Sequence, residues 1–341
     1  MSDKSPQQAI ILVGGLGTRL RPLTYQMPKA LLPVANRPLL SYELEWLRRA
    51  GVRQVILAVS YQAETLQAGL GDGSAWGVEL VYVQERERLD TAGALKNCAP
   101  HLHGRFWALN GDLIYDFDPA LMVAEHEAQA ATLSLTLRRV EDISPFGLIQ
   151  RDERGRVTAF LEKVAQDPTG QNTVNAGIYL MEPEALASAP AGLPYSNEHQ
   201  LFPGLLAQGA TVLGYLPPHM TYWSDVGRID TYLQANHDLL AGALPWVRPG
   251  VDPSATVDPA AELVPPCSLA ERVAIGAGAR VGPYVSLGAG VTVGEGARLA
   301  ESVVLPGATM GSAAWVENVV VAAGETVPAG HHQESGVIYS G

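Results

Sequence analysis

The sequence of 341 residues predicts an α/β domain with a mixed, mostly parallel sheet, followed by a parallel β-helix. Two observations carry this prediction. In the first part of the chain, short apolar runs of strand length alternate with amphipathic runs of helix length, which is typical of a parallel sheet covered on both faces. In the last part, aliphatic residues recur at a strict interval of six, a period that neither a helix nor an ordinary sheet has. We expect two domains, residues 1–245 and residues 246–341, with a linker at residues 243–250.

The apolar and amphipathic runs define the elements expected in the first domain. Continuous apolar runs predict buried strands at residues 10–13, 54–59, 79–83 and 106–109. Leucines at helical spacing predict a helix at residues 38–50. Further helices are expected at residues 62–70, before a Gly-Asp-Gly turn, and at about residues 230–240. Alternation with period two predicts a strand at residues 131–138, followed by a hairpin of residues 146–150 and 157–163. Strands therefore replace helices in the second half of this domain.

The strand at residues 10–13 opens directly into a glycine-rich loop. Glycine backbone can approach a ligand closely, and its successive N–H groups can bind phosphate oxygens. The residues expected to do so are Gly14, Gly15, Gly17 and Thr18. Positive charge for a polyphosphate is available from the side chains of Arg19, Arg21 and Lys29. The spacing is neither the GxGxxG of a dinucleotide fold nor the GxxxxGK(S/T) of a P-loop, so both are set aside.

The run from Gly14 to Thr24, GGLGTRLRPLT, followed by Pro28-Lys29 and Pro33, resembles the signature of the sugar-nucleotide pyrophosphorylases. These nucleotidyltransferases join a nucleoside triphosphate to a sugar 1-phosphate. The resemblance implies a Rossmann-like catalytic domain and a left-handed, triangular β-helix with three hexads to a turn. It also implies that Arg19 holds the leaving pyrophosphate and that Lys29 holds the α-phosphate.

The segment between the third and fourth strands is expected to line the base pocket. Its sequence TAGA at residues 91–94 resembles part of a Gly-Thr-Ala-Gly-Ala segment of the family. By this resemblance Gln84 reads the edge of the nucleobase and Gly93 packs against it. The family usually has Gly where this chain has Asp90, whose carboxylate either accepts from an amino group, as guanine offers, or faces water. Without the resemblance, the segment is an ordinary helix start capped by Thr91.

Two aspartates that follow strands are candidate metal ligands. Asp112 ends an Asn-Gly-Asp run after the strand at residues 106–109, and Asp225 lies in Trp-Ser-Asp-Val-Gly after an aromatic strand. Aspartates in such places are usually turn or helix-capping residues, as we expect of Asp118 before the helix that starts near Pro119. The resemblance instead implies that Asp112 and Asp225 hold one Mg²⁺, which takes one or two protein carboxylates plus substrate phosphates.

The strands after residue 131 resemble the sugar-binding half of the family's domain. The resemblance implies that the backbone of Gly147 meets the sugar and that Asn175 contacts a sugar hydroxyl. It implies that Glu162 binds another hydroxyl and that Lys163 binds the phosphate of the sugar 1-phosphate. The family commonly has Pro where this chain has Val164, a change expected to affect the loop more than the chemistry.

The repeat runs from Val251 to Leu305 as ten aliphatic residues six positions apart. Hexapeptides of this kind build a β-helix whose coils bury their aliphatic residues against their neighbours. The register slips after Leu305 and resumes at Val321, so we expect one loop around Trp315. Acyltransferases with this repeat use a histidine between coils as general base, but residues 251–330 contain neither His nor Lys. We therefore expect the module to serve oligomerisation or regulation and the chain to form a homo-oligomer.

Composition and charge argue against several other classes of protein. The formal net charge of -12 disfavours nucleic acid or an anionic membrane as partner. Cys98 and Cys267 lie far apart without metal-ligand spacing, which argues against structural zinc and suits a reducing compartment. The first residues lack the pattern of a signal peptide, and no apolar stretch approaches the roughly 20 residues of a membrane span. A cytoplasmic protein is expected.

The resemblance favours GTP and mannose 1-phosphate as substrates, with GDP-mannose and pyrophosphate as products. The Leu-Val-Gly-Gly opening, the Pro-Lys spacing and the TAGA segment look like those of mannose-1-phosphate guanylyltransferases. Glucose-1-phosphate thymidylyltransferases and uridylyltransferases share most of these features and stay as an alternative. A non-catalytic regulatory subunit that binds a sugar nucleotide is a further alternative. Such subunits typically lose the signature Arg, the Lys or a metal-binding Asp, all of which this chain keeps.

Overall fold

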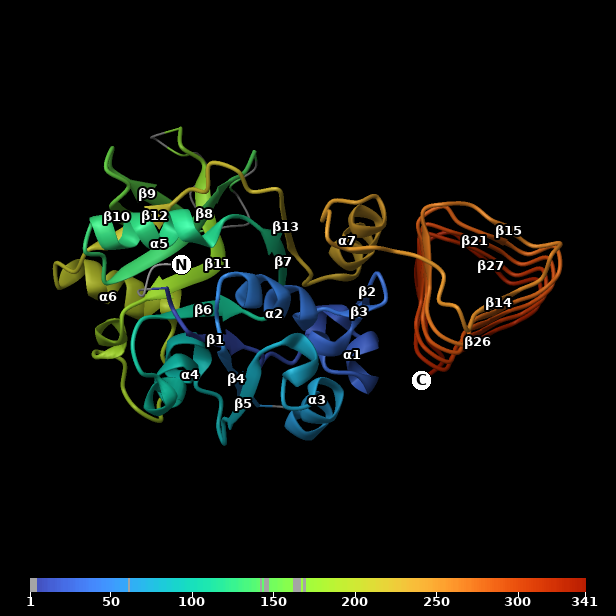
Figure 1. Ribbon diagram of the computed structural model, residues 1–341, viewed down its shortest axis with the longest axis horizontal. Helices are drawn as coiled ribbons and strands as arrows, with labels where there is room; N and C mark the ends of the chain where they lie inside the picture. The colour runs from blue at the N-terminus through green and yellow to red at the C-terminus, as the bar shows by residue number, and fades with distance from the viewer. Residues whose placement is uncertain (1–4, 61, 142, 144–146, 162–166, 168–169) are drawn as a thin grey trace. The chain divides into compact units, whose positions relative to one another are not determined.

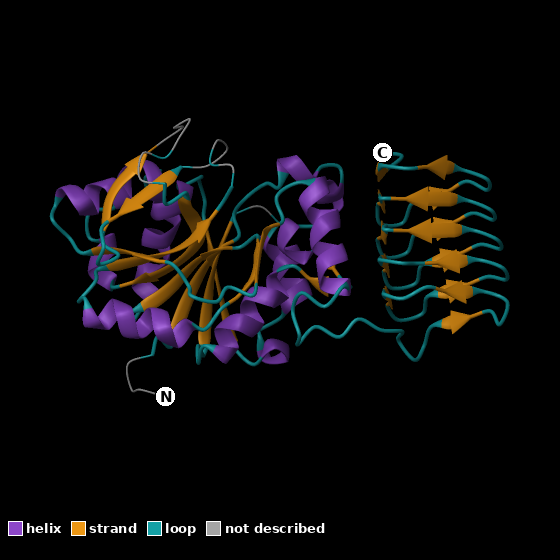
Figure 2. Cartoon of the chain, turned by 90° about the horizontal axis from the view of Figure 1, so that it is seen from above, coloured by secondary structure: helices purple, strands orange, loops and turns teal. Residues whose placement is uncertain are grey.

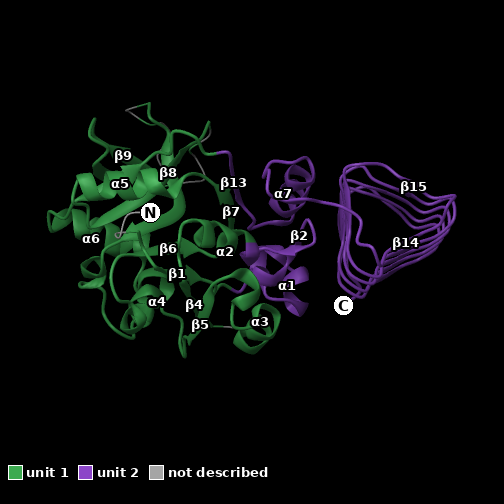
Figure 3. Ribbon diagram, in the orientation of Figure 1, with its two compact units in different colours: residues 1–15, 42–220 green, residues 16–41, 221–341 purple. Residues whose placement is uncertain are grey.

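The computed structural model in Figure 1 divides into two compact units, which Figure 3 colours separately. Unit 1 comprises residues 1–15 and 42–220, and unit 2 comprises residues 16–41 and 221–341. The glycine signature is thus divided, because Gly14 and Gly15 belong to unit 1 and the residues from Leu16 onward to unit 2. The domain boundary predicted at residue 245 stays a prediction. The structure describes residues 5–60, 62–141, 143, 147–161, 167 and 170–341.

Unit 1 is built on one nine-stranded mixed sheet, which confirms the predicted α/β architecture. Its strands are β1 (Gln8–Leu12), β4 (Gln54–Val59), β5 (Glu79–Gln84), β6 (Phe106–Asn110), β8 (Leu133–Arg139), β9 (Leu148–Arg151), β10 (Val157–Leu161), β11 (Thr173–Met181) and β12 (Val212–Tyr215). The central strands run parallel in the order β6-β1-β4-β5, and β11 joins β6 in the antiparallel direction. The hairpin of β9 and β10 extends the sheet beyond β11, while β8 pairs with β11 and β12. A further strand, β7 (Leu113–Asp116), directly follows β6 in the chain.

Helices pack on both faces of this sheet (Figure 1). They are α2 (Leu40–Arg49), α3 (Ala63–Leu70), α4 (Asp90–Cys98), α5 (Pro119–Ala128) and α6 (Phe202–Ala207), with a π-helical turn at Asn197–Leu201 before α6. On one face, Leu95 of α4 is buried in a cluster with Ile10 and Ile56 of the sheet. On the other face, Trp46 of α2 packs edge-on against Trp107 of β6, with ring centroids 5.1 Å apart. Among the described residues, no helix has both the length and the apolar character needed to span a bilayer.

The segment of residues 16–41 forms the first part of unit 2 and ends in a small hairpin. Its elements are the 3₁₀ helices Thr18–Leu20 and Lys29–Leu31, α1 (Leu23–Gln26), β2 (Pro33–Val34) and β3 (Arg37–Pro38). The turn between β2 and β3 holds Ala35 and Asn36 at φ 46° and 62°, the left-handed region that Asn adopts more readily than most residues. The Asn36 amide donates to the carbonyl and hydroxyl oxygens of Ser268 and to the carbonyl of Leu287, each at 3.0 Å. One side chain thus ties this hairpin to two coils of the β-helix.

The hairpin is also bonded to the helix that precedes the β-helix. Residues 221–240 form β13 (Tyr222–Asp225) and α7 (Ile229–Leu240). The N–H of Ala35 donates to the Asn236 side chain at 2.8 Å, and the Tyr232 hydroxyl donates to the carbonyl of Pro33 at 2.5 Å. These bonds explain why residues 16–41 group with the last third of the chain.

The rest of unit 2 is a parallel β-helix, with a triangular outline in Figure 1 and stacked coils in Figure 2. Each face is a five-stranded parallel sheet, in the orders β14-β17-β20-β23-β26, β15-β18-β21-β24-β27 and β16-β19-β22-β25-β28. Its strands are β14 (Thr256–Val257), β15 (Glu262–Leu263), β16 (Cys267–Leu269), β17 (Ala274–Ile275), β18 (Arg280–Val281), β19 (Val285–Leu287), β20 (Thr292–Val293), β21 (Arg298–Ala300), β22 (Val303–Val304), β23 (Thr309–Met310), β24 (Trp315–Glu317), β25 (Val319–Val321), β26 (Thr326–Val327), β27 (His332–Gln333) and β28 (Gly336–Ile338). The aliphatic residues of successive coils form one buried core, and the predicted left-handed β-helix agrees with this arrangement.

The slip in the repeat comes from shorter coils, so the loop predicted around Trp315 is wrong. In the first coils strands pair residues 18 positions apart, as Arg280 with Arg298. In the later coils they pair residues 17 positions apart, as Arg298 with Trp315 and Trp315 with His332. Trp315 therefore lies in a regular strand of the stack. One residue fewer per turn moves the aliphatic positions out of the six-residue series while the three faces stay aligned.

Candidate active site

The glycine-rich loop leaves the sheet at the end of β1. The N–H of Val13 donates to the carbonyl of Ala58 at 3.0 Å, and the Ser60 hydroxyl donates to the carbonyl of Gly14 at 2.5 Å. A side chain at Gly14 would begin 3.2 Å from that hydroxyl oxygen, whereas nothing lies within 4 Å of the same position at Gly15. The loop is therefore fixed to β4 at Gly14 and open at Gly15, and phosphate binding by its N–H groups stays a prediction.

Asp112 is placed by the close packing of Gly111 against the end of β1. The last residues of β1 and β6 are paired, and the N–H of Gly111 continues this pairing by donating to the carbonyl of Leu12 at 3.0 Å. A Cβ at Gly111 would lie 2.6 Å from the Val13 side chain and 2.7 Å from the Leu12 carbonyl, so only glycine fits. The half-buried Asp112 therefore follows at the edge of the sheet where the glycine-rich loop after β1 begins. This loop, which starts at Gly14, is called the Gly14 loop below.

The predicted base segment is bonded to residues at the start of the π-helical turn and just before it. The N–H of Gly93 donates to the carbonyl of Tyr195 at 3.0 Å, and the Thr91 hydroxyl accepts from the N–H of Asn197 at 2.7 Å. A Cβ at Gly93 would lie 2.6 Å from the carbonyl oxygen of Leu193. This close approach between two backbone segments is a packing reason for glycine at position 93.

Asp90 begins α4, so the cap expected of Thr91 is not observed. The φ of Asp90 is 59°, the left-handed conformation in which glycine is favoured and aspartate is tolerated. Its carboxylate is exposed and accepts from the N–H of Thr91 at 2.7 Å. The backbone conformation gives a physical reason for the glycine that the family usually has here. Gln84 ends β5 and is exposed.

Asn175 lies at an irregularity in β11. The register between β11 and β8 shifts between Asn175 and Tyr179, and Gly177 has φ 79°. The Asn175 amide donates to the Tyr179 hydroxyl at 2.8 Å, and its oxygen accepts from the N–H of Gly177 at 3.0 Å. The side chain of Asn175 is thus fixed by its own strand. Gly147 is half-buried just before β9, while Glu162 and Lys163 lie outside the described residues.

In unit 2, Gly17 shapes the loop that carries the signature cations. Its φ is 59°, its carbonyl accepts from the Thr24 hydroxyl at 2.9 Å, and a Cβ would lie 2.8 Å from the Thr24 methyl group. Thr18 and Arg19 follow as exposed residues of the first 3₁₀ helix. Lys29 begins the second 3₁₀ helix and is half-buried.

Gly227 brings Arg19 and Asp225 together. A Cβ at this position would lie 2.8 Å from Oδ1 of Asp225 and 2.9 Å from Nη2 of Arg19. The bare α-carbon therefore leaves room for a carboxylate and a guanidinium side by side. Arg19 also lines a cavity of about 910 Å³ within unit 2, together with Gln234 of α7 and Asn318 of the β-helix.

The carboxylates fit the predicted Mg²⁺ by their chemistry. Mg²⁺ prefers oxygen donors and usually keeps waters and substrate phosphates as ligands, so one or two carboxylates suffice. Asp225, beside the space that a Cβ at Gly227 would fill, is a donor of this kind, and so is Asp112. Within the described part of the chain, no group of three or more His, Cys, Asp or Glu side chains could hold a metal. The predicted site has only two carboxylates, so it is too small to count as a group of this kind.

Glu85 was not singled out from the sequence, although it lies at the same edge of the sheet. Its N–H donates to the carbonyl of Val59 at 2.8 Å and so continues the pairing of β4 and β5. Burial raises the pKa of the Glu85 carboxyl above its usual value. The sequence offered one signal, the position directly after a strand that ends beside the Gly14 loop.

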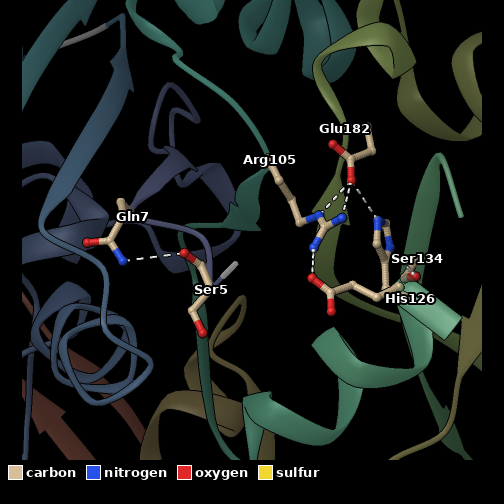
Figure 4. Close-up of polar contacts among 7 residues, drawn as sticks. Ser5, Gln7, Arg105, His126, Ser134 and Glu182 are labelled. Carbon is tan, nitrogen blue, oxygen red and sulfur yellow. Dashed lines mark hydrogen bonds and ion pairs between the residues drawn. The ribbon is translucent and has the colours of Figure 1, made fainter. Parts of the chain in front are cut away.

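A second polar cluster lies at the opposite edge of the sheet (Figure 4). Arg105, just before β6, donates to Glu182 at 2.6 Å and to Glu127 at 2.7 Å. His126 is buried between Glu182 at 3.4 Å and the Ser134 hydroxyl at 2.7 Å. Because Arg105 and Asn110 flank opposite ends of β6, this cluster is separate from the candidate site.

Comparison with known proteins identifies the family. A family model described as nucleotidyl transferase matches residues 8–242, more than half of the chain. The chain belongs to this nucleotidyl transferase family. A second model, the GMPPB C-terminal domain, matches residues 263–340 of the β-helix. The membership predicted from the signature is therefore confirmed.

Individual relatives carry two different names. The mannose-1-phosphate guanylyltransferase of Mycobacterium tuberculosis is 40% identical over 239 residues, which are 70% of this chain and 66% of that relative. A UTP–glucose-1-phosphate uridylyltransferase of Synechocystis is 31% identical over 261 residues, 72% of this chain and 66% of the relative. The chain thus spans slightly less than two thirds of either relative. The crystal structure of HddC from Yersinia pseudotuberculosis has a TM-score of 0.59 and 25% identity, covering 68% of this chain and 99% of that one.

Proposed function

We propose that this nucleotidyl transferase transfers the guanylyl group of GTP to mannose 1-phosphate and releases pyrophosphate. The observation that carries the proposal is the arrangement at Gly227, where Arg19 and Asp225 lie together. The relative at 40% identity, a mannose-1-phosphate guanylyltransferase, supports the choice of substrates. The presence of Arg19, Lys29, Asp112 and Asp225 supports catalysis over a regulatory role.

The proposed reaction is an in-line displacement at the α-phosphorus of GTP. A phosphate oxygen of mannose 1-phosphate forms the new P–O bond, and the bond from the α-phosphorus to the bridging oxygen of the β-phosphate breaks. Pyrophosphate leaves with the electron pair of that bond, and GDP-mannose remains. Because no side-chain nucleophile takes part, the protein contributes positioning and stabilisation of negative charge.

The signature residues are assigned to the phosphates. Arg19 would hold the β- and γ-phosphates that become pyrophosphate, and Lys29 the α-phosphate. The N–H groups of Gly14 and Gly15 would donate to phosphate oxygens, because glycine has no side chain of its own to keep a phosphate away. Asp112 and Asp225 would hold Mg²⁺, which when bound supplies positive charge to the phosphates.

The sugar 1-phosphate is assigned to the other half of unit 1. Lys163 would bind its phosphate, and Glu162 and Asn175 its hydroxyls, with the backbone of Gly147 against the ring. For Asn175, the assignment is supported by the fixed orientation of its amide.

The test is pyrophosphate release with Mg²⁺ for each of GTP, UTP and dTTP combined with mannose 1-phosphate or glucose 1-phosphate. We expect turnover with GTP and mannose 1-phosphate, and a large loss in Arg19→Ala. Arg248→Ala, a change of an exposed residue in the linker, is the matched control. Absence of turnover from folded protein in every combination would contradict the proposal.

A uridylyltransferase acting on glucose 1-phosphate is the second candidate, because the Synechocystis relative carries that name. A preference for UTP and glucose 1-phosphate in the same panel would select it, and the assignments to the phosphates would be unaffected.

We also propose that copies of the chain associate through the β-helix. Trp315 supports this, since 40% of it is exposed on one parallel sheet of the β-helix, where its ring stacks on His332 with centroids 4.0 Å apart. Sedimentation velocity of the full chain and of Trp315→Glu tests it, and a monomeric wild type would contradict it.

A further inference from the structure

The carboxylate of Glu85 faces the space next to the Gly14 loop. A Cβ at Gly14 would lie 3.6 Å from Oε1 of Glu85 and 3.2 Å from the Ser60 hydroxyl. Since glycine has no Cβ, this carboxylate borders bare backbone at the point where β1, β4 and β5 end. In open α/β sheets, ligands bind at the carboxyl ends of such strands.

Glu85 has little hydrogen bonding of its own. Among the described residues, its carboxylate has one hydrogen bond, from the N–H of Leu89, which donates to Oε2 at a long 3.4 Å. No ion pair of Glu85 occurs among the described residues. Burial is the main cause of its raised pKa, and the charge of Arg88 opposes this only in part. A half-buried carboxylate with one weak donor is left with unused acceptor capacity, which a ligand with N–H groups can fill.

We propose that Glu85 selects guanine by accepting hydrogen bonds from its N1–H and its 2-amino group. The inference rests on the proposed function and names the residue that determines its base specificity. Guanine presents two adjacent donors on one edge, which match the two oxygens of a carboxylate. Uracil and thymine present one N–H between two carbonyl oxygens, and adenine presents an acceptor at N1. Each of these would place an oxygen or nitrogen lone pair against the carboxylate.

Two other residues that the sequence placed near the base are less suited to this role. Asp90 is exposed and accepts from the neighbouring N–H of Thr91. Gln84 is exposed at the end of β5, whereas Glu85 is half-buried. Of the three carboxylates in residues 84–90, Glu87 and Asp90 are exposed, and Glu85 is the half-buried one that borders the Gly14 loop.

The experiment compares GTP with ITP, which lacks the 2-amino group and is otherwise the same. The readout is the ratio of kcat/KM for GTP over ITP, measured by pyrophosphate release with mannose 1-phosphate. Loss of a hydrogen bond to a charged group lowers kcat/KM by about 10- to 150-fold, so we expect wild type to prefer GTP to ITP by that factor. In Glu85→Gln the ratio should fall to about 3 or less. The amide offers one neutral, weaker acceptor, and its other group is a donor. Glu87→Gln, an exposed neighbour, should keep the wild-type ratio.

Two outcomes would overturn the proposal. The first is a wild-type enzyme that uses GTP and ITP equally. This result needs no variant, so the test does not depend on Glu85→Gln being folded. A Glu85→Gln variant that loses GTP and ITP activity to the same extent would show a structural role. Failure of the proposed function is distinguishable, because wild type would then prefer UTP or dTTP to both purine nucleotides.

Discussion

Replacing Gly227 by alanine tests the arrangement on which the proposed function depends. The new Cβ would lie 2.8 Å from Oδ1 of Asp225 and 2.9 Å from Nη2 of Arg19. Ordinary contact begins at 3.4 Å, so the two groups must move by about 0.6 Å and 0.5 Å if the backbone stays in place. The φ of Gly227 is outside the left-handed region, so alanine introduces no backbone strain.

The displacement is large enough to measure in the kinetics. A misplacement of 1 Å costs about 100-fold in rate, so half an ångström costs about 10-fold for each group. We expect kcat/KM of Gly227→Ala to fall by about 10- to 100-fold, a loss of about 1.4 to 2.7 kcal/mol in transition-state stabilisation. The melting temperature should change by only a few degrees.

The assay is pyrophosphate release under saturating Mg²⁺, with Gly250→Ala as the matched control. Gly250 also lies in unit 2, and nothing occurs within 4 Å of the Cβ that alanine would add. If Gly227→Ala kept wild-type kcat/KM, Arg19 and Asp225 would not act from the positions described, and the assignment of both to the phosphates would be wrong.

Three further predictions follow from other contacts. Asp112→Asn and Asp225→Asn should each lower kcat by about 100-fold or more with the fold intact, and near-normal turnover in either would refute its role as metal ligand. Asn36→Ala removes donors to Ser268 and Leu287 and should lower the free energy of unfolding by about 1 to 3 kcal/mol in urea denaturation; no change would mean that water replaces these bonds. The pKa of His126 is lowered to about 4, mainly by burial and then by the charge of Arg105. Because the unfolded chain binds this proton near pH 6.5, the free energy of unfolding should fall as pH drops from about 6.5 to about 4, and His126→Gln should reduce this slope.

The strands were predictable wherever burial is complete. The runs at residues 54–59 and 106–109 are apolar at nearly every position because both faces of the sheet are covered, and the observed strands differ from the predicted ones by one residue or less. The glycines were predictable as close approaches, but the contacts that require them, such as that between position 93 and Leu193, involve distant segments. Contacts between distant segments cannot be predicted from the spacing of residues along the chain.

Other features could not be read from local patterns. Counting hexads placed a loop at Trp315, because a coil shortened by one residue and an inserted loop break the series alike. Glu85 looks like a surface carboxylate in sequence, and its burial depends on how β5 and the Gly14 loop lie beside β4. The bonds between residues 16–41 and the last third of the chain involve Ala35, Asn36 and Pro33, whose distant partners no motif specifies.

The bond between Asn36 and Ser268 has a consequence for the order in which the protein matures during synthesis. The two residues are 232 positions apart, and Asn36 reaches Leu287 across 251 positions. At translation rates of about 5 to 20 residues per second, the hairpin waits roughly 10 to 50 s for its partners to be made. All residues of unit 1, which are 1–15 and 42–220, are synthesised before Ser268 and Leu287. A ribosome that stalls before the β-helix therefore leaves a chain in which Asn36, in the same segment as Arg19, lacks Ser268 and Leu287 as partners.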